Sequence, residues 1–98
     1  MATEIPALEK RSFRLAGHRT SVALEPEFWS AVERLARAQN EPVSTLVTRV
    51  DAGRRVGQGL ASALRITILR SLELTSQKQL EAQSEGRQIG RALTGEDA

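Results

Sequence analysis

The stretch RTSVALEPEFW, residues 19–29, places a strand pattern directly before a helix start. Alternation in its first half gives a strand with two different faces. The face expected to be buried carries Thr20, Val22 and Leu24, and the face expected to be exposed carries Arg19, Ser21 and Ala23. Pro26 suits the first helical position, because its missing N–H would be unpaired there, and the acids on either side complement the helix dipole. The stretch therefore predicts a short strand that leads straight into a helix.

The helix that starts at Pro26 is expected to be amphipathic and to end near Asn40. Its apolar side chains recur at helical spacing: Phe28, Ala31, Val32, Leu35 and Ala36. Asn40 suits a left-handed terminator, and Pro42 prevents the helix from continuing. Ser44 then suits the N-cap of a second helix, whose apolar stripe is Leu46, Val47 and Val50.

After the second helix, three glycines around Arg54-Arg55 predict a loop or a frayed helix end. Residues 60–74 are strongly apolar and favour a third helix, although residues 65–69 alone would also fit a strand. The polar residues that follow are expected to extend this helix to about Glu85 and then to become disordered. The chain thus divides into three parts: a flexible tail (1–9), a domain (10–74), and a polar, partly helical or disordered tail (75–98).

The predicted strand needs a partner, because its backbone N–H and C=O groups would otherwise lack hydrogen bonds. One candidate is local: residues 12–15 also alternate and could pair back through residues 16–19. The other is the same strand of a second copy, paired antiparallel about a two-fold axis. We favour the dimer, because a lone hairpin on one helical layer is marginally stable. The residues expected in the shared dimer core are Thr20, Val22, Leu24, Phe28, Trp29, Val32, Leu46 and Val50.

The composition excludes several classes of function. The chain has no cysteine and one histidine, so it offers no disulfide framework and no thiolate metal site. It contains no apolar run long enough to span a membrane, and its first residues do not resemble a signal peptide, so we expect a cytoplasmic location. No catalytic constellation and no phosphate loop or dinucleotide motif occurs, which argues against an enzyme and against a bound cofactor or metal.

The charge distribution points to an anionic partner. Residues 10–24 and 43–70 each carry a net charge of +4, whereas the three remaining segments each carry −2. Twelve of the fourteen cations are arginine, whose planar fork of donors suits phosphate and guanine. A two-stranded ribbon fits the major groove of DNA, so its outward side chains would reach base edges. A solvated surface with an arginine bias is the alternative interpretation.

The order of strand, Pro-initiated helix, Asn-containing turn and Ser-capped helix resembles the ribbon-helix-helix repressors. Residues 10–29, KRSFRLAGHRTSVALEPEFW, are similar to a bacterial ribbon-helix-helix domain family with a Gly-His-Arg-Thr-Ser lead-in and a Phe-Trp pair at the helix start. Residues 60–69, LASALRITIL, are similar to that family's third helix. The resemblance implies a mainly α fold with one short β-strand, in which two chains of a homodimer form an intermolecular two-stranded antiparallel ribbon.

The resemblance also implies that different residues contact the bases and the phosphates of DNA. The base-reading positions would be Arg19, Ser21 and Ala23, although alanine departs from the polar residue usual at the third position. The phosphate contacts would come from Ser44 and Thr45 at the start of the second helix, and we add Arg14 and Arg11 from the basic segment.

We therefore predict a sequence-specific DNA-binding transcriptional regulator, in particular a repressor, with double-stranded DNA and a second copy of itself as partners. Further dimers could assemble on DNA. The alternative is a protein-interaction or antitoxin-like module, in which the fold dimerises and the third helix and tail bind a partner protein.

Overall fold

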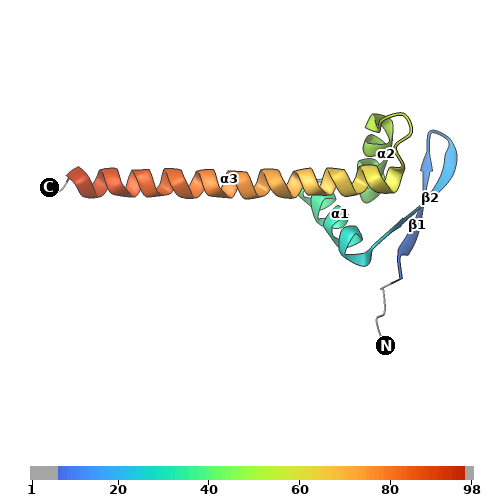
Figure 1. Ribbon diagram of the computed structural model, residues 1–98, viewed down its shortest axis with the longest axis horizontal. Coiled ribbons are helices and arrows are strands. Elements are labelled where there is room, and N and C mark those ends of the chain that lie inside the picture. Colours follow the sequence, from blue (N-terminus) through green and yellow to red (C-terminus); the bar gives the residue numbers. More distant parts are fainter. Residues whose placement is uncertain (1–6, 97–98) are drawn as a thin grey trace.

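The computed structural model describes the backbone of residues 7–96 and the side chains of residues 7–84. Two strands, β1 (Glu9–Leu15) and β2 (His18–Leu24), precede three helices, α1 (Pro26–Ala38), α2 (Val43–Gly53) and α3 (Leu60–Glu96). The strands, α1 and α2 gather around the first turns of α3, and the rest of α3 extends away from them as a rod (Figure 1). Most of the tail predicted at 1–9 lies outside the described residues, but Glu9 already belongs to β1.

The two strands form an antiparallel hairpin within one chain, so the prediction of a single strand was wrong. The register pairs Leu15 with His18 and Glu9 with Leu24, which leaves a two-residue turn of Ala16 and Gly17. Both turn residues have positive φ, 52° and 82°, as a tight hairpin turn that follows the strand twist requires. The local alternative is therefore the pairing observed. The first half of β1 is charged and shows no alternation of apolar residues, which is why it escaped prediction.

Helix α1 begins and ends as its sequence predicts. Pro26 occupies the first turn, and Glu25 is the N-cap, without a side-chain hydrogen bond. At the other end Asn40 adopts a left-handed φ of 57°. The N–H of Asn40 donates to Arg37 O, and the N–H of Glu41 donates to Ala36 O, which is the Schellman pattern of helix termination.

Helix α2 begins one residue before the predicted cap. Pro42 is its N-cap, and the carbonyl of Pro42 accepts hydrogen bonds from the N–H groups of Thr45 and Leu46. Ser44 therefore lies inside the first turn, exposed to solvent, and its assignment as N-cap was wrong. The physical reason is that proline already holds the extended backbone that a cap position needs, with φ −66° and ψ 155°.

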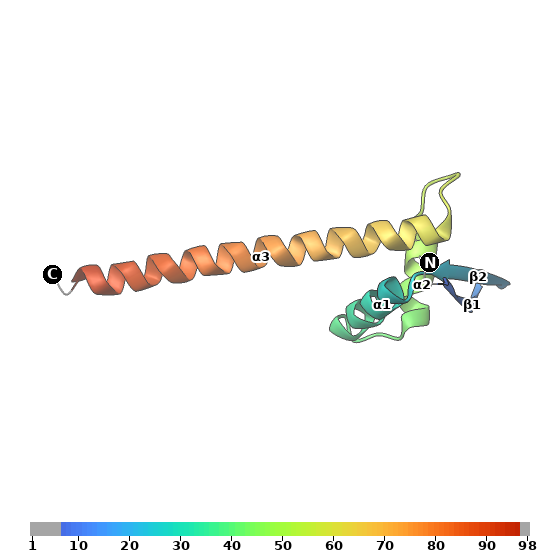
Figure 2. The same cartoon turned by 60° about the horizontal axis from the view of Figure 1, so that its bottom comes forward.

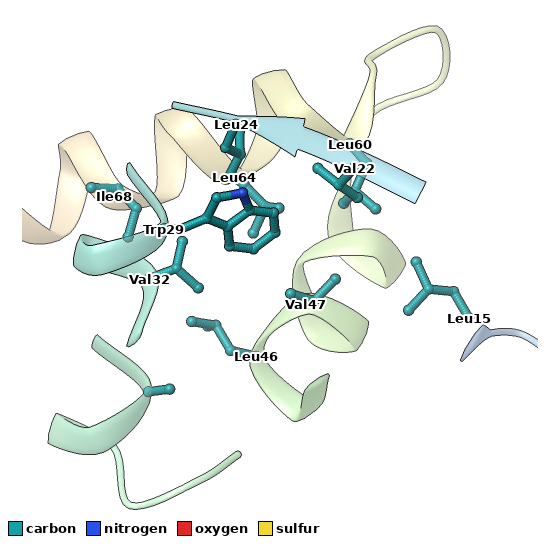
Figure 3. Close-up of a cluster of buried hydrophobic side chains, with 11 residues drawn as sticks. Leu15, Val22, Leu24, Trp29, Val32, Leu46, Val47, Leu60, Leu64 and Ile68 are labelled. Carbon is teal, nitrogen blue, oxygen red and sulfur yellow. The ribbon is translucent and has the colours of Figure 1, made fainter. Parts of the chain in front are cut away.

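Helix α3 completes the hydrophobic core of the single chain. Its Leu60, Leu64 and Ile68 pack with side chains from β2, α1 and α2 (Figure 3). The segment 65–69, which would also fit a strand, is helical, and the helix continues beyond the predicted Glu85. No helix in the described part of the chain is long and apolar enough to cross a membrane.

Most of the residues predicted for a shared dimer core belong to this intrachain core. Five of the eight are buried within one chain: Val22, Leu24, Trp29, Val32 and Leu46. The other three are partly exposed: Thr20, Phe28 and Val50. The five buried residues thus pack in one core with α3 of the same chain, and contact with a second chain remains a prediction.

Trp29 attaches β1 to α1. Its indole Nε1 donates a hydrogen bond of 2.7 Å to the carbonyl of Glu9, where β1 begins. The ring of Phe13 lies 5.9 Å from the indole, and the guanidinium of Arg11 stacks over it at 4.6 Å. The inner face of the hairpin is thus fixed against the helices, and the opposite face is directed to solvent.

Candidate nucleic-acid interface

The solvent face of the hairpin combines three outward side chains from each strand. Antiparallel pairing places Lys10 opposite Ala23, Ser12 opposite Ser21, and Arg14 opposite Arg19. Side chains paired in this way project from the same face of the sheet. All are exposed except Ala23, which is half-buried. We call these six residues the basic hairpin face, because they include three cations and no carboxylate.

The predicted base-reading residues all belong to this face. Arg19, Ser21 and Ala23 follow one another at two-residue intervals along β2, as alternation predicted. The hydroxyls of Ser21 and Ser12 lie 3.1 Å apart and form a hydrogen bond across the strands. Lys10 and Ser12 were missed as members of the face, and they could have been found by extending the two-residue period of the strand back from Arg14.

Arg11 is directed to the inner side of the hairpin. Its Nε bonds Glu9 at 2.7 Å, and its Nη2 forms an ion pair with Glu33 of α1 at 2.9 Å. The hydrogen bond that Arg11 donates to Glu9 and the pairing with Glu33 raise the pKa of Arg11 above its ordinary value, although partial burial opposes this. Because two carboxylates and the Trp29 ring already occupy its guanidinium, we withdraw Arg11 as a phosphate contact.

A hollow between β1 and α2 brings together the other predicted phosphate contacts. It is lined by Arg14, Ser44, Thr45, Thr48, Arg49 and Ala52, and we call it the β1–α2 hollow. The N–H groups of Val43 and Ser44, in the first turn of α2, have no acceptor within the helix, and the helix dipole is positive at this end. The arrangement of a cation, two hydroxyl side chains and a helix N-terminus is suited to a phosphate group.

The remaining side chains of the hollow are held in place by contacts within α2 and the preceding turn. The hydroxyl of Thr48 donates to the carbonyl of Ser44 at 2.8 Å. Arg49 binds both carboxylate oxygens of Glu41 at 2.7 Å and the side-chain oxygen of Gln39 at 2.6 Å. This pairing lowers the pKa of Glu41 and leaves Arg14 as the cation of the hollow that forms no ion pair within the described residues.

The basic hairpin face lies at the end of the molecule opposite to the C-terminus of α3 (Figure 2). His18 is exposed beside the turn. Among the residues that the structure describes, no group of acidic or histidine side chains is arranged to hold a metal ion. The concentration of outward arginine, lysine and serine on a two-stranded ribbon beside a helix N-terminus is suited to contact with an anionic partner.

Comparison with known families agrees with this geometry. The family model described as a ribbon-helix-helix domain matches residues 8–72. The chain belongs to the ribbon-helix-helix domain family. Ribbon-helix-helix domains are commonly DNA-binding regulators that bind as dimers, and they are not typically enzymes. No curated protein and no solved structure gave a significant match.

Proposed function

We propose that this ribbon-helix-helix protein is a sequence-specific DNA-binding regulator that reads the major groove with its basic hairpin face. The observation that carries the proposal is the placement of three cations and no carboxylate on the solvent side of the hairpin, next to the β1–α2 hollow. The opposite face packs against the helices through the buried Leu15, Val22 and Leu24, so the basic face is the more accessible side of the hairpin.

The three outward residues of β2 have the chemistry to read bases. Arg19 can donate two hydrogen bonds to the acceptors on the major-groove edge of guanine. Ser21 can donate or accept a hydrogen bond. Its present bond to Ser12 is exposed, so a base could replace Ser12 as its partner. Ala23 can only contact the methyl group of thymine, so Arg19 is expected to provide most of the discrimination.

Phosphate contacts at the β1–α2 hollow would fix the position of the hairpin on the duplex. Arg14 supplies the charge, Ser44 supplies its hydroxyl and its first-turn N–H, and Thr45 supplies its hydroxyl. Such contacts orient a protein on DNA without reading its sequence.

A dimer through the free edge of β2 would complete the reading surface. β2 has β1 on one edge and, within the described residues, no strand on the other. Antiparallel pairing with a second copy would give the order β1–β2–β2–β1. Because strands lie about 4.8 Å apart, the two central strands fit a major groove about 12 Å wide. The outer strands would then be about 14 Å apart, which places their cations near the phosphates on both groove walls.

A dimer bound in this way would exclude other proteins from the groove, so we propose that the protein acts as a repressor in the bacterial cytoplasm. Selection of bound sequences from random duplex DNA tests the proposal, and we expect an enriched motif with two-fold symmetry. Absence of enrichment, together with DNA binding that does not respond to salt, would contradict it.

Substitution of Arg19 tests the assigned surface. Arg19→Ala is expected to cost about 1–3 kcal/mol of binding to the selected site and to relax preference at one base pair of each half-site. Arg14→Ala is expected to weaken selected and scrambled duplexes alike and to reduce the salt slope by about one. Arg37→Ala on the exposed face of α1 is the matched control. Full affinity and specificity in the Arg19 variant would show that this face does not read DNA.

The second candidate function is a protein-interaction or antitoxin-like module, and the exposed surface of α3 favours it. Beyond Ile68, the described side chains of this helix include four leucines that are each more than half exposed: Leu69, Leu72, Leu74 and Leu80. These leucines would suit a partner protein. A chain that bound such a partner without binding DNA would support this candidate over the first.

A further inference from the structure

A second basic hollow lies on the other side of α2, away from the hairpin. It is formed by the C-terminal half of α2, the loop 54–59 and the first turns of α3, and it encloses about 320 Å³. This volume is at the lower end of the range for small-molecule pockets. The polar side chains that line it are Arg49, Arg54, Arg55, Gln58, Thr67 and Arg70. We call it the α2–α3 hollow.

The arginines of this hollow are only partly neutralised. Arg49 is paired with Glu41, and Arg54 is paired with Asp51 at 2.7 Å. Arg55 and Arg70 form no ion pair with any described side chain, and no carboxylate lines the hollow. Glu73 lies one turn beyond Arg70 but is not within ion-pair distance. Guanidinium groups that face one hollow repel each other, so a bound anion would stabilise the arrangement.

The loop that carries two of these arginines is held by its own hydrogen bonds. Arg54 Nη1 donates to the carbonyl of Gln58 at 2.7 Å, while its Nε is fixed by Asp51. The side-chain oxygen of Gln58 accepts from the N–H of Arg55 at 3.0 Å, and the backbone N–H of Gln58 donates to the carbonyl of Arg55. The amide nitrogen of Gln58 therefore remains available as a donor. Gly57, at φ 83°, permits the turn that brings these groups together.

Only some of this cluster is explained by the fold. Arg54 lies just after the C-terminus of α2, where a cation is favoured by the helix dipole. Arg55 and Arg70 make no comparable contact, yet they come from a loop and a helix that meet at the hollow. Val50, Ala63 and Ile66 give the same hollow an apolar wall, which suits the uncharged part of a ligand.

We propose that the α2–α3 hollow binds a phosphate-type anion through Arg55 and Arg70, with Arg54 and the amide of Gln58 as additional donors. Two sources have this chemistry: the backbone of a bound duplex, or a free phosphate-bearing ligand. Arg49 lines both this hollow and the β1–α2 hollow, so the two basic surfaces adjoin along α2. The duplex as source depends on the proposed DNA-binding function, whereas the free ligand does not.

Titration with pyrophosphate, followed by amide NMR of the full chain without DNA, tests the site directly. We expect saturable shifts at Arg55, Gln58 and Thr67. Affinity should be at least about tenfold weaker in Arg55→Ala/Arg70→Ala, because two charge-assisted hydrogen-bonding groups are removed. Arg34→Ala/Arg37→Ala removes the same charge from α1, outside the hollow, and should bind as the original chain does. Circular dichroism of each variant verifies that it is folded.

The source is assigned by a parallel DNA titration at several salt concentrations. The quantity compared is the slope of the logarithm of the DNA-binding constant against the logarithm of the salt concentration. If the magnitude of this slope in Arg55→Ala/Arg70→Ala falls by about one for each phosphate that the variant no longer neutralises, the site belongs to the duplex backbone. If the double variant keeps the slope of the original chain but binds pyrophosphate more weakly, the site belongs to a free ligand. Absence of saturable pyrophosphate binding, together with an unchanged slope, would overturn the proposal. If the original chain binds no DNA, the proposed function fails, but the pyrophosphate titration still decides the site.

Discussion

Trp29 connects elements that are far apart in the sequence. It is 1% exposed, and its indole N–H bonds the carbonyl of Glu9, twenty residues earlier in the chain. A residue in α1 thus holds the first residue of β1, and the hairpin depends on this attachment because a two-stranded sheet is marginally stable alone.

Replacing Trp29 with Phe is expected to loosen β1. The substitution removes the hydrogen bond to Glu9, which is worth about 1 kcal/mol, and leaves a smaller ring in the core. The free energy of unfolding, measured with urea and circular dichroism, should fall by at least about 1 kcal/mol. Val56→Ala at a fully exposed loop position is the control and should change little. Unaltered stability in Trp29→Phe would mean that the hydrogen bond does not stabilise the fold.

The hairpin has an unfavourable residue at its turn. Ala16 has φ 52°, in the left-handed region that residues with a Cβ rarely adopt, and Gly17 follows at 82°. In two-residue turns of this kind the favoured pair is Asn-Gly. Ala16→Asn is therefore expected to stabilise the protein by about 0.5–1 kcal/mol, measured from the urea midpoint. The branched residue of Ala16→Val should destabilise it. Equal stability of the two variants would contradict the turn geometry.

The junction between β2 and α1 is tied to α3 by an ion pair. Glu25 accepts two hydrogen bonds from Arg65, at 3.1 and 2.8 Å. The carboxylate is stabilised first by its own backbone N–H and then by Arg65, and both lower the pKa of Glu25 below its ordinary value. A carboxyl group whose pKa is depressed in the folded state contributes stability above its unfolded pKa. That contribution is lost as the pH falls through the folded value.

Replacing Glu25 with Gln should therefore give a pH-dependent loss of stability. We expect the thermal midpoint of Glu25→Gln to lie below that of the original chain at pH 7, and the difference to shrink below about pH 4. High salt should also reduce this difference, because the pair is partly exposed to solvent. Glu27→Gln, which removes a neighbouring charge without an Arg65 contact, is the control. A difference that is constant from pH 7 to pH 3 would exclude the ion pair as its cause.

At the scale of the whole molecule, α3 has two different parts. Its first turns complete the core through Leu60, Leu64 and Ile68, whereas the described side chains beyond Ile68 are not buried. The division of the chain at about residue 74 remains a prediction, and the family match to residue 72 is compatible with it.

Removing residues 76–98 should leave both the fold and the proposed dimer intact, because the free edge of β2 lies far from the deleted segment. Light scattering at micromolar concentration should give about twice the monomer mass for both chains, where the full monomer is 10.7 kDa. A dimeric full chain with a monomeric truncation would place the interface on α3. A monomeric full chain would eliminate pairing through the β2 edge and leave one hairpin as the reading surface.

Local patterns in the sequence were sufficient to predict the two faces of β2 and the ends of α1. Alternation in β2 correctly separated Val22 and Leu24 from Arg19 and Ser21, because neighbouring side chains of a strand project from opposite faces wherever the strand lies. Pro26 and Asn40 marked the ends of α1, because their steric preferences act within one or two residues. The candidate phosphate contacts Arg14, Ser44 and Thr45 were also named, although their common location was not.

Tertiary structure decided which segments meet. The attachment of β1 to α1 involves the hydrogen bond from Trp29 to the carbonyl of Glu9, and no pattern within β1 reports that contact. Arg11 and Arg14 are alike in the sequence, yet Arg11 lies between Glu9, Glu33 and the indole while Arg14 lies in the β1–α2 hollow. The first turns of α3 join the core beside β2, α1 and α2. Periodicity reports which side chains share a face, but the seating of the hairpin on the helices and the pairing of Arg11 with Glu33 depend on distances between segments remote in sequence.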